Sequence, residues 1–134
     1  MIVAKTKANV ALSDLQIAVM RVLWRQGESG VTEVARVLAE ERSLKYTTVA
    51  TLLTRLEKRG VVQQRRDGRQ LIYRATVSEP QVRRSMVTGL VDSLFGGDAQ
   101  ELVAHLVSES ELSPGDLELV RKRLGKSSRN GGKS

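Results

Sequence analysis

Short hydroxyl side chains and cations recur at helical spacing between residues 46 and 60. Thr47, Thr51 and Thr54 share one face of a helix predicted there, with Lys58 further along that face and Arg55 at its flank. Short hydroxyls let a backbone come close to base edges, and Lys and Arg reach phosphate oxygens. A helix exposed only to water would more often carry Glu–Lys pairs. The pattern therefore predicts a helix that reads nucleic acid.

A basic hairpin follows this helix directly. Alternating residues 61–66 and 69–76 flank Asp67-Gly68, a strong hairpin signal because both central positions of the favoured turn have positive φ. Arg65, Arg66 and Arg69 surround the turn and suit a phosphate backbone or an adjacent minor groove. Solvated loop charge is the alternative. We interpret the two elements as a recognition helix and its wing.

Positive charge is concentrated on these two elements. Residues 43–76 carry eight Lys or Arg and two Asp or Glu, a net charge of +6, within a chain of net charge +7. Residues 77–120 carry two cations and eight anions, and residues 121–134 carry six cations and no anion. Scattered basic residues would indicate only a soluble surface, but this block coincides with the recognition pattern and favours nucleic acid.

Composition argues against several other classes of protein. Aromatic residues make up 3% of the chain, which disfavours stacking on single-stranded bases. There are no cysteines, and the single histidine, His105, has no ligand set around it, so we expect no metal or other cofactor. No phosphate-binding loop or nucleophile motif occurs, so we do not expect this protein to be an enzyme. No apolar run approaches the roughly 20 residues that span a bilayer, and we expect a cytoplasmic protein without membrane insertion.

The elements around the recognition helix fit a winged helix-turn-helix domain over residues 12–77. Ser13 and Gln16 form a capping box for a first helix that ends near Gly27, and Thr32 caps a second helix to about Arg42. The short link over residues 43–46 leads into the third helix, as a helix-turn-helix requires. Trp24 is expected at the edge of the core. The fold class is thus mainly α with a small β-hairpin wing, preceded by a flexible arm over residues 1–11.

Three further helices are expected over residues 78–124, beginning at Ser78, Asp98 and Ser113. Alone they would be marginal, so we expect them to bury their apolar faces against a second copy, although packing on the winged domain of the same chain is the alternative. The residues expected at this dimer interface are Val82, Met86, Leu90, Leu94, Leu102, Leu106, Leu117 and Val120. The basic, Gly- and Ser-rich residues 125–134 are expected to be disordered.

On these residues the chain resembles the BlaI/MecI family of bacterial repressors, over roughly residues 12–124. The likeness is densest from Tyr46 to Gly60, and Leu12 to Gln16, Phe95-Gly96-Gly97 and Leu112 to Leu117 add support. The resemblance implies a homodimer, joined through its C-terminal helices, that binds a double-stranded operator with dyad symmetry at the nucleoid and blocks transcription. The resemblance places Thr47, Thr48, Thr51 and Arg55 at the DNA-facing positions of the recognition helix. The full set of expected DNA-binding residues is Tyr46, Thr47, Thr48, Thr51, Thr54, Arg55, Lys58, Arg59, Arg65, Arg66 and Arg69.

The resemblance also bears on induction. In antibiotic-responsive members, a membrane sensor with a metalloprotease domain triggers cleavage within the dimerisation domain. The corresponding bond here is His105–Leu106, where those members have Asn-Phe. Ala50 stands where some members carry a base-reading arginine, and the cysteine motif of the copper-responsive branch is absent.

A small-molecule-responsive regulator of the MarR kind is the alternative function. It would need a ligand pocket between the dimer helices and the winged domain. The helices after Ser78 look short and tightly filled, with few polar groups to orient a ligand.

Overall fold

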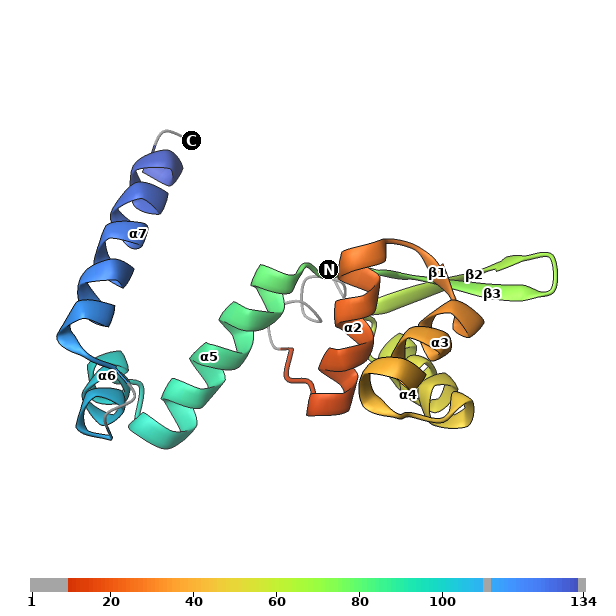
Figure 1. Cartoon of the computed structure of the whole chain (residues 1–134), viewed down its shortest axis with the longest axis horizontal. Coiled ribbons are helices and arrows are strands. Elements are labelled where there is room, and N and C mark those ends of the chain that lie inside the picture. The colour runs from red at the N-terminus through yellow and green to blue at the C-terminus, as the bar shows by residue number, and fades with distance from the viewer. Residues whose placement is uncertain (1–9, 110–111, 133–134) are drawn as a thin grey trace. The chain divides into compact units, whose positions relative to one another are not determined.

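The computed structural model describes the backbone of residues 10–109 and 112–132, with side chains as far as residue 125. Two compact units divide after Gly89, and each is described by itself. The first contains α2 (Asp14–Gln26), β1 (Ser29–Gly30), α3 (Val31–Arg42), α4 (Tyr46–Lys58), β2 (Val62–Asp67), β3 (Gln70–Ala75) and the first part of α5 (Glu79–Phe95). The rest of α5, α6 (Ala99–Ser108) and α7 (Pro114–Gly132) belong to the second unit (Figure 1).

Local sequence signals set the ends of the first helices. The Gln16 amide donates to Ser13 Oγ at 3.2 Å and the Ser13 amide donates to Gln16 Oε1 at 3.0 Å, which confirms the capping box. Helix α2 ends at Gly27, whose φ is +80°. Helix α3 is capped by Gly30 rather than by Thr32, so that prediction was wrong. The physical reason is that Gly30 is held extended in β1, and the helix begins directly after it.

Strand β1 was not predicted from the sequence. It pairs Ser29 with Tyr73 and Gly30 with Ile72, and so adds a strand to the predicted hairpin, in the order β1-β3-β2. Two residues are too few to show an alternating pattern. The hairpin is therefore the projecting part of a three-stranded antiparallel sheet (Figure 1).

The turn of the hairpin lies one residue later than predicted. Asp67 pairs with Gln70, so Gly68 and Arg69 are the two central residues. Gly68 has a φ of +65°, while Asp67 and Arg69 do not have positive φ. A glycine at the first central position is the signature of the type II′ turn, the other favoured two-residue hairpin turn.

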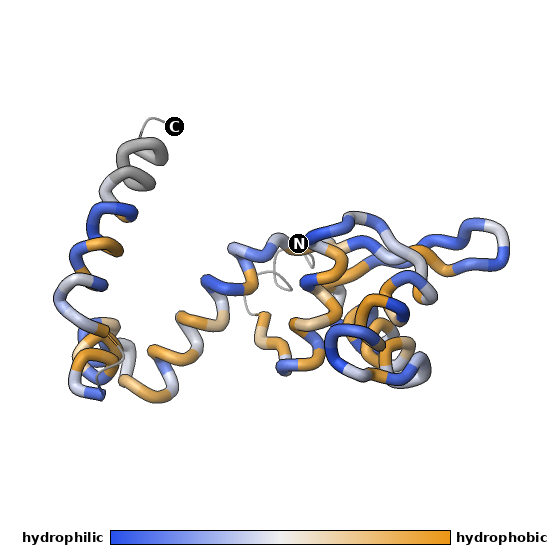
Figure 2. Tube along the Cα trace, in the orientation of Figure 1, coloured by the Kyte–Doolittle hydropathy of each residue, from blue (hydrophilic) through white to orange (hydrophobic). Residues whose placement is uncertain are grey.

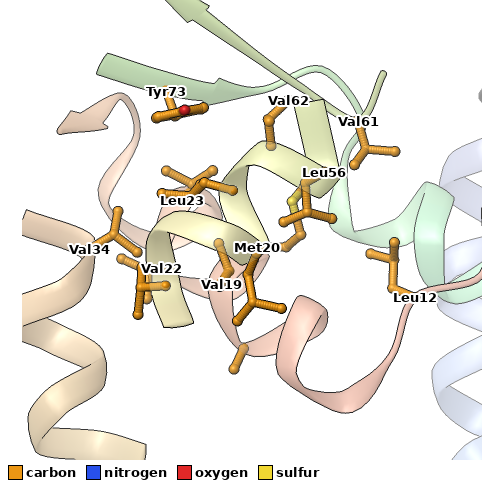
Figure 3. Packing of buried hydrophobic residues seen from close by; sticks show 14 of the residues in the cluster. Leu12, Val19, Met20, Val22, Leu23, Val34, Leu56, Val61, Val62 and Tyr73 are labelled. Carbon is orange, nitrogen blue, oxygen red and sulfur yellow. The ribbon is translucent and has the colours of Figure 1, made fainter. Parts of the chain in front are cut away.

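One hydrophobic core joins the helices and the sheet of the first unit. Met20, Leu38 and Leu53 from the three helices are at most 1% exposed, and Tyr73 from the sheet is 4% exposed (Figure 3 shows much of this packing). The indole nitrogen of Trp24 donates to the Val77 carbonyl at 2.9 Å, which places Trp24 at the core's edge as predicted.

The core extends beyond residues 12–77 at both ends. Val10 is 1% exposed and its amide donates to Ser85 Oγ at 2.7 Å, so the predicted flexible arm does not include residue 10. Residues 1–9 of that arm lie outside the described residues. Val82 is 3% exposed in the same core and Met86 packs against it, which explains why the unit continues to Gly89.

Glycines and caps mark the end of α5 and the starts of α6 and α7, as the sequence indicated. Gly96 and Gly97 have positive φ after α5, and the Gly97 amide donates to the Val91 carbonyl at 3.0 Å. Asp98 caps α6 through the Gln100 amide at 3.0 Å, and Ser113 caps α7 through the Asp116 amide at 3.1 Å.

Helix α7 continues through residues that we expected to be disordered. It reaches Gly132, so the prediction for residues 125–134 differs from the structure up to that residue, and residues 133–134 lie outside the described part. No proline interrupts this stretch, which permits a helix, although each of its glycines costs about 1 kcal/mol relative to alanine.

Candidate nucleic-acid interface

Helix α4 separates its two faces cleanly. Val49, Leu53 and Leu56 are fully buried and Leu52 is 7% exposed. The opposite face is open to solvent and carries, as predicted from the spacing, Thr47, Thr51, Thr54, Arg55 and Lys58. Tyr46, the first residue of the helix, is 53% exposed, whereas Thr48 is half-buried. The buried face fixes the orientation of the polar one.

The first turn of α4 is open to an anion. Within the described residues, no side chain caps this turn at its N-cap Lys45, and the turn contains no acidic residue. The last turn contains Arg55 and Lys58. A helix N-terminus has unpaired amide groups and a partial positive charge, so the first turn can attract phosphate. The last turn can do so through the side chains of Arg55 and Lys58.

The threonines of α4 differ in what they can offer. The Thr54 hydroxyl donates to the Ala50 carbonyl at 3.0 Å, so its proton is already used and its oxygen can only accept from a ligand. The hydroxyls of Thr47 and Thr51 make no hydrogen bond with the part of the chain that the structure describes. Thr47 and Thr51 are therefore the better candidates for contacts to base edges.

Arg59 has a role that the sequence did not reveal. It closes α4, and its guanidinium donates to the Ala11 carbonyl at 2.5 Å. The segment before α2 is thereby attached to the end of α4. Part of the guanidinium that we expected at the DNA is thus engaged inside the chain.

The three wing arginines are not equivalent. Arg65 makes a two-bond ion pair with Glu28, with Nε at 3.0 Å and Nη2 at 2.9 Å from the carboxylate oxygens. The hydrogen bond from Arg65 lowers the pKa of Glu28, and the hydrogen bond to Glu28 raises the pKa of Arg65. Arg66 and Arg69 are exposed and form no ion pair among the described residues. A phosphate contact by Arg65 stays a prediction, and it would require the guanidinium to leave its exposed pair with Glu28.

Two residues expected at the dimer interface pack on the core of the first unit instead. Val82 is 3% exposed and belongs to its core, and Met86 is half-buried against that core, so little of either side chain is available to a second copy. The apolar face of α5's first turns was assigned to the wrong neighbour because periodicity shows that a face is buried but not against what.

The second unit leaves much apolar surface exposed within the single chain. Leu90, Leu94 and Val120 are 39%, 68% and 47% exposed, whereas Leu102, Leu106 and Leu117 are half-buried. Figure 2 shows the apolar residues along α5 and α6. The exposed apolar residues that the prediction omitted are Val103, Val107, Leu119 and Leu124.

The His105–Leu106 bond lies inside α6. The His105 side chain is exposed, and its ring centroid is 6.0 Å from that of Phe95 at an interplanar angle of 57°. In this structure, a protease that cuts this bond would therefore have to act on helical backbone.

Neither a cluster of three metal-binding side chains nor a helix able to cross a membrane occurs within the described residues.

A cavity of about 200 Å³ lies between α2 and α5 in the first unit. It is lined by Ile17, Arg21, Trp24, Glu79, Val82, Arg83, Met86 and Val87. The expectation that the residues after Ser78 fill their surroundings tightly therefore does not hold beside Trp24, where this cavity remains.

Comparisons with known proteins identify the family of the chain. A family model described as penicillinase repressor matches residues 12–126. The methicillin resistance regulatory protein MecI of Mammaliicoccus sciuri is 24% identical over 115 residues, which cover 86% of this chain and 94% of that protein. The penicillinase repressor of Bacillus licheniformis is 24% identical over 102 residues, covering 76% and 80%. A solution structure of monomeric Bacillus licheniformis BlaI with the blaP half-operator has a TM-score of 0.48 at 28% identity, covering 54% of this chain and 88% of that one.

Proposed function

The chain belongs to the penicillinase repressor family, and from this premise we propose that it is a transcriptional repressor that binds double-stranded DNA in a sequence-specific way. One observation carries the proposal. Helix α4 buries a complete apolar face and presents hydroxyls and cations on the other, with an uncapped first turn. A surface of this kind suits base edges and phosphates better than it suits water alone.

In the proposed complex, the start of α4 enters the major groove. Thr47 and Thr51 contact base edges there, and Arg55 and Lys58 contact phosphates. Arg66 and Arg69 bring the wing to the backbone next to the groove. Base contacts supply the sequence preference, whereas the four cations supply affinity that falls as salt is added.

We further propose that two copies bind together through the second unit. Its helices expose large apolar side chains, which a second copy would cover. Two recognition helices related by a two-fold axis read half-sites one or two helical turns apart, about 34 Å per turn. Joining two half-site contacts raises affinity by roughly 10²–10⁴-fold, so separating the copies would relieve repression.

Proteolysis is the proposed route to that separation. A cut at His105–Leu106 would divide the second unit between α5 and α7. The protease would be a membrane sensor with a metalloprotease domain, as the family resemblance implies. Because the bond is helical, cleavage requires α6 to open locally first. Mass spectrometry of the chain recovered from induced cells tests this; a chain that stays intact while repression is lifted would exclude it.

The proposed function is tested by gel shift and footprinting on the DNA upstream of the protein's own gene. We expect a retarded complex at low salt and protection of two related half-sites. Thr47→Ala and Thr51→Ala should weaken the specific complex more than the non-specific one. The proposal fails if the wild-type chain retards no double-stranded fragment at low ionic strength.

A second candidate function rests on the cavity between α2 and α5. Trp24, Val82 and Met86 give it an apolar wall, so it suits a small aromatic compound. Arg21 and Arg83 also line it, but Arg83 is paired with Glu79 at 3.5 Å, which leaves Arg21 as the cation for a carboxylate. At about 200 Å³ it is smaller than the usual ligand pocket of roughly 300–1,000 Å³. Thermal-shift measurements with benzoates and phenols test this function. A concentration-dependent rise in melting temperature that Trp24→Ala abolishes would support it, and no rise would exclude it.

A further inference from the structure

The wing has two faces, and its arginines are divided between them. Successive residues of a strand point to opposite sides of the sheet. Arg66 lies opposite Leu71 and Gln64 lies opposite Tyr73 in the pairing of β2 with β3, so Arg66 shares the face of the two side chains that pack on the core. Arg65 lies on the other face, opposite Ile72.

The face that carries Arg66 is joined to the recognition helix. Gln64 Nε2 donates to Glu57 Oε2 on α4 at 3.3 Å. Arg66 follows two residues further toward the tip, on the same face, and Arg69 lies in the turn itself. The direction of the outer part of the wing therefore decides where both cations lie relative to α4.

The Glu28–Arg65 pair lies on the opposite face of the wing. Glu28 lies in the link between α2 and β1, while Arg65 is on β2, at the other edge of the sheet. The ion pair thus crosses β3 and joins the two edges. A planar guanidinium with two bonds to one carboxylate restrains orientation as well as distance. Because the pair is exposed, it can bias the orientation of the wing by a few-fold at most.

We propose that Glu28 is a positioning residue for DNA binding: through Arg65 it holds the wing so that Arg66 and Arg69 meet the phosphate backbone while α4 lies in the groove. The inference rests on the proposed function. It means that an acidic side chain, Glu28, favours the binding of a polyanion. Glu28 itself touches no phosphate.

This role gives Glu28→Gln an effect of unusual sign. Removing an anion near DNA strengthens binding on electrostatic grounds alone, and it also releases Arg65 to contact phosphate. If Glu28 positions the wing, the same change weakens binding several-fold. It also lowers the slope of log K against log salt by up to about 1.8, the value for two lost phosphate contacts.

The experiment titrates the full-length chain with a short fluorescent duplex of mixed sequence between about 50 and 200 mM salt. Glu40→Gln is the matched control, because Glu40 is an exposed acid on α3 with no partner among the described residues, and it should bind as tightly as wild type or more tightly. Glu28→Arg combined with Arg65→Glu keeps the net charge, restores the pair in reverse, and should recover most of the lost affinity and slope. Thermal unfolding confirms that each variant is folded.

The outcomes are distinguishable. A wild-type chain that binds no duplex would overturn the proposed function and this inference together. Wild-type binding with a Glu28→Gln variant that binds as tightly as Glu40→Gln would overturn the inference alone. Weak binding by Glu28→Gln that the reversed pair does not restore would also overturn it, since the loss would then not come from the ion pair.

Discussion

At residue 51, a hydroxyl on the open face of α4 marks the position where a base contact is expected. Replacing Thr51 with arginine puts a long cation with two parallel donors against the groove. Arginine prefers guanine O6 and N7, and such a contact discriminates by about 1–3 kcal/mol. We therefore expect Thr51→Arg to change the preferred sequence in selection from randomised duplexes. Thr32→Arg adds the same charge on exposed α3 and should leave the preference unchanged; equal preferences for both variants and wild type would contradict our placement of α4.

At residue 58, a cation near the end of the same helix should act differently. A phosphate contact is the same at every sequence, so Lys58→Ala should weaken specific and non-specific duplexes alike and reduce the salt slope by about 0.9. Equilibrium binding at several salt concentrations measures both quantities. Arg36→Ala is the control, because Arg36 is already neutralised by Glu33 on α3. A loss confined to one sequence would show that Lys58 reads bases.

The contribution of single residues could be predicted from the sequence only where it depends on local spacing. The exposed hydroxyls and cations of α4 followed from the helical period, which is a local property. The partner of Arg65 could not be found this way, because Glu28 is 37 positions away and reaches it only across a folded sheet. Arg59 is a similar case, since its Ala11 partner is 48 positions away.

Among the elements, α4 depends on the core for its orientation. Leu53 is fully buried, and Leu53→Ala should lower the free energy of unfolding by about 2–5 kcal/mol, because it removes apolar contacts and leaves a cavity. Urea unfolding followed by Trp24 fluorescence measures this. Thr54→Ala, one residue on but exposed, should cost well under about 1 kcal/mol. Similar losses for the two variants would mean that α4 is not packed as described.

Elements with a local signal were predicted well, and elements that depend on distant pairing were not. The caps at Ser13 and Asp98 and the end of α2 at Gly27 follow from contacts within four residues, so they were located correctly. Strand β1 exists only because β3 lies beside it, and that pairing also moved the cap of α3 to Gly30. The hairpin turn differed by one residue because Asp-Gly and Gly-Arg both satisfy a two-residue turn.

For the whole molecule, the two units differ in how their apolar residues are used. In the first unit they form one core that includes Val10 and Val82. In the second, large apolar side chains on α5, α6 and α7 are exposed within the single chain. The apolar residues of the second unit could be predicted from the sequence. That Val82 and Met86 pack on the core of the first unit could not. The first unit therefore has a hydrophobic core of its own, whereas the second unit exposes apolar surface of the kind that a partner covers.

The last prediction tests that difference. Val120 is 47% exposed and lies one turn from Leu117 and Leu124 on the same face of α7. If this face meets a second copy, Val120→Glu places a charge in an apolar interface and should shift the chain to monomer in sedimentation, with operator affinity reduced by roughly 10²–10⁴-fold. Lys122→Glu changes more charge on the opposite side of the helix and should leave the mass unchanged. A Val120→Glu chain that remains dimeric, or a wild-type chain that is monomeric, would show that α7 does not join two copies.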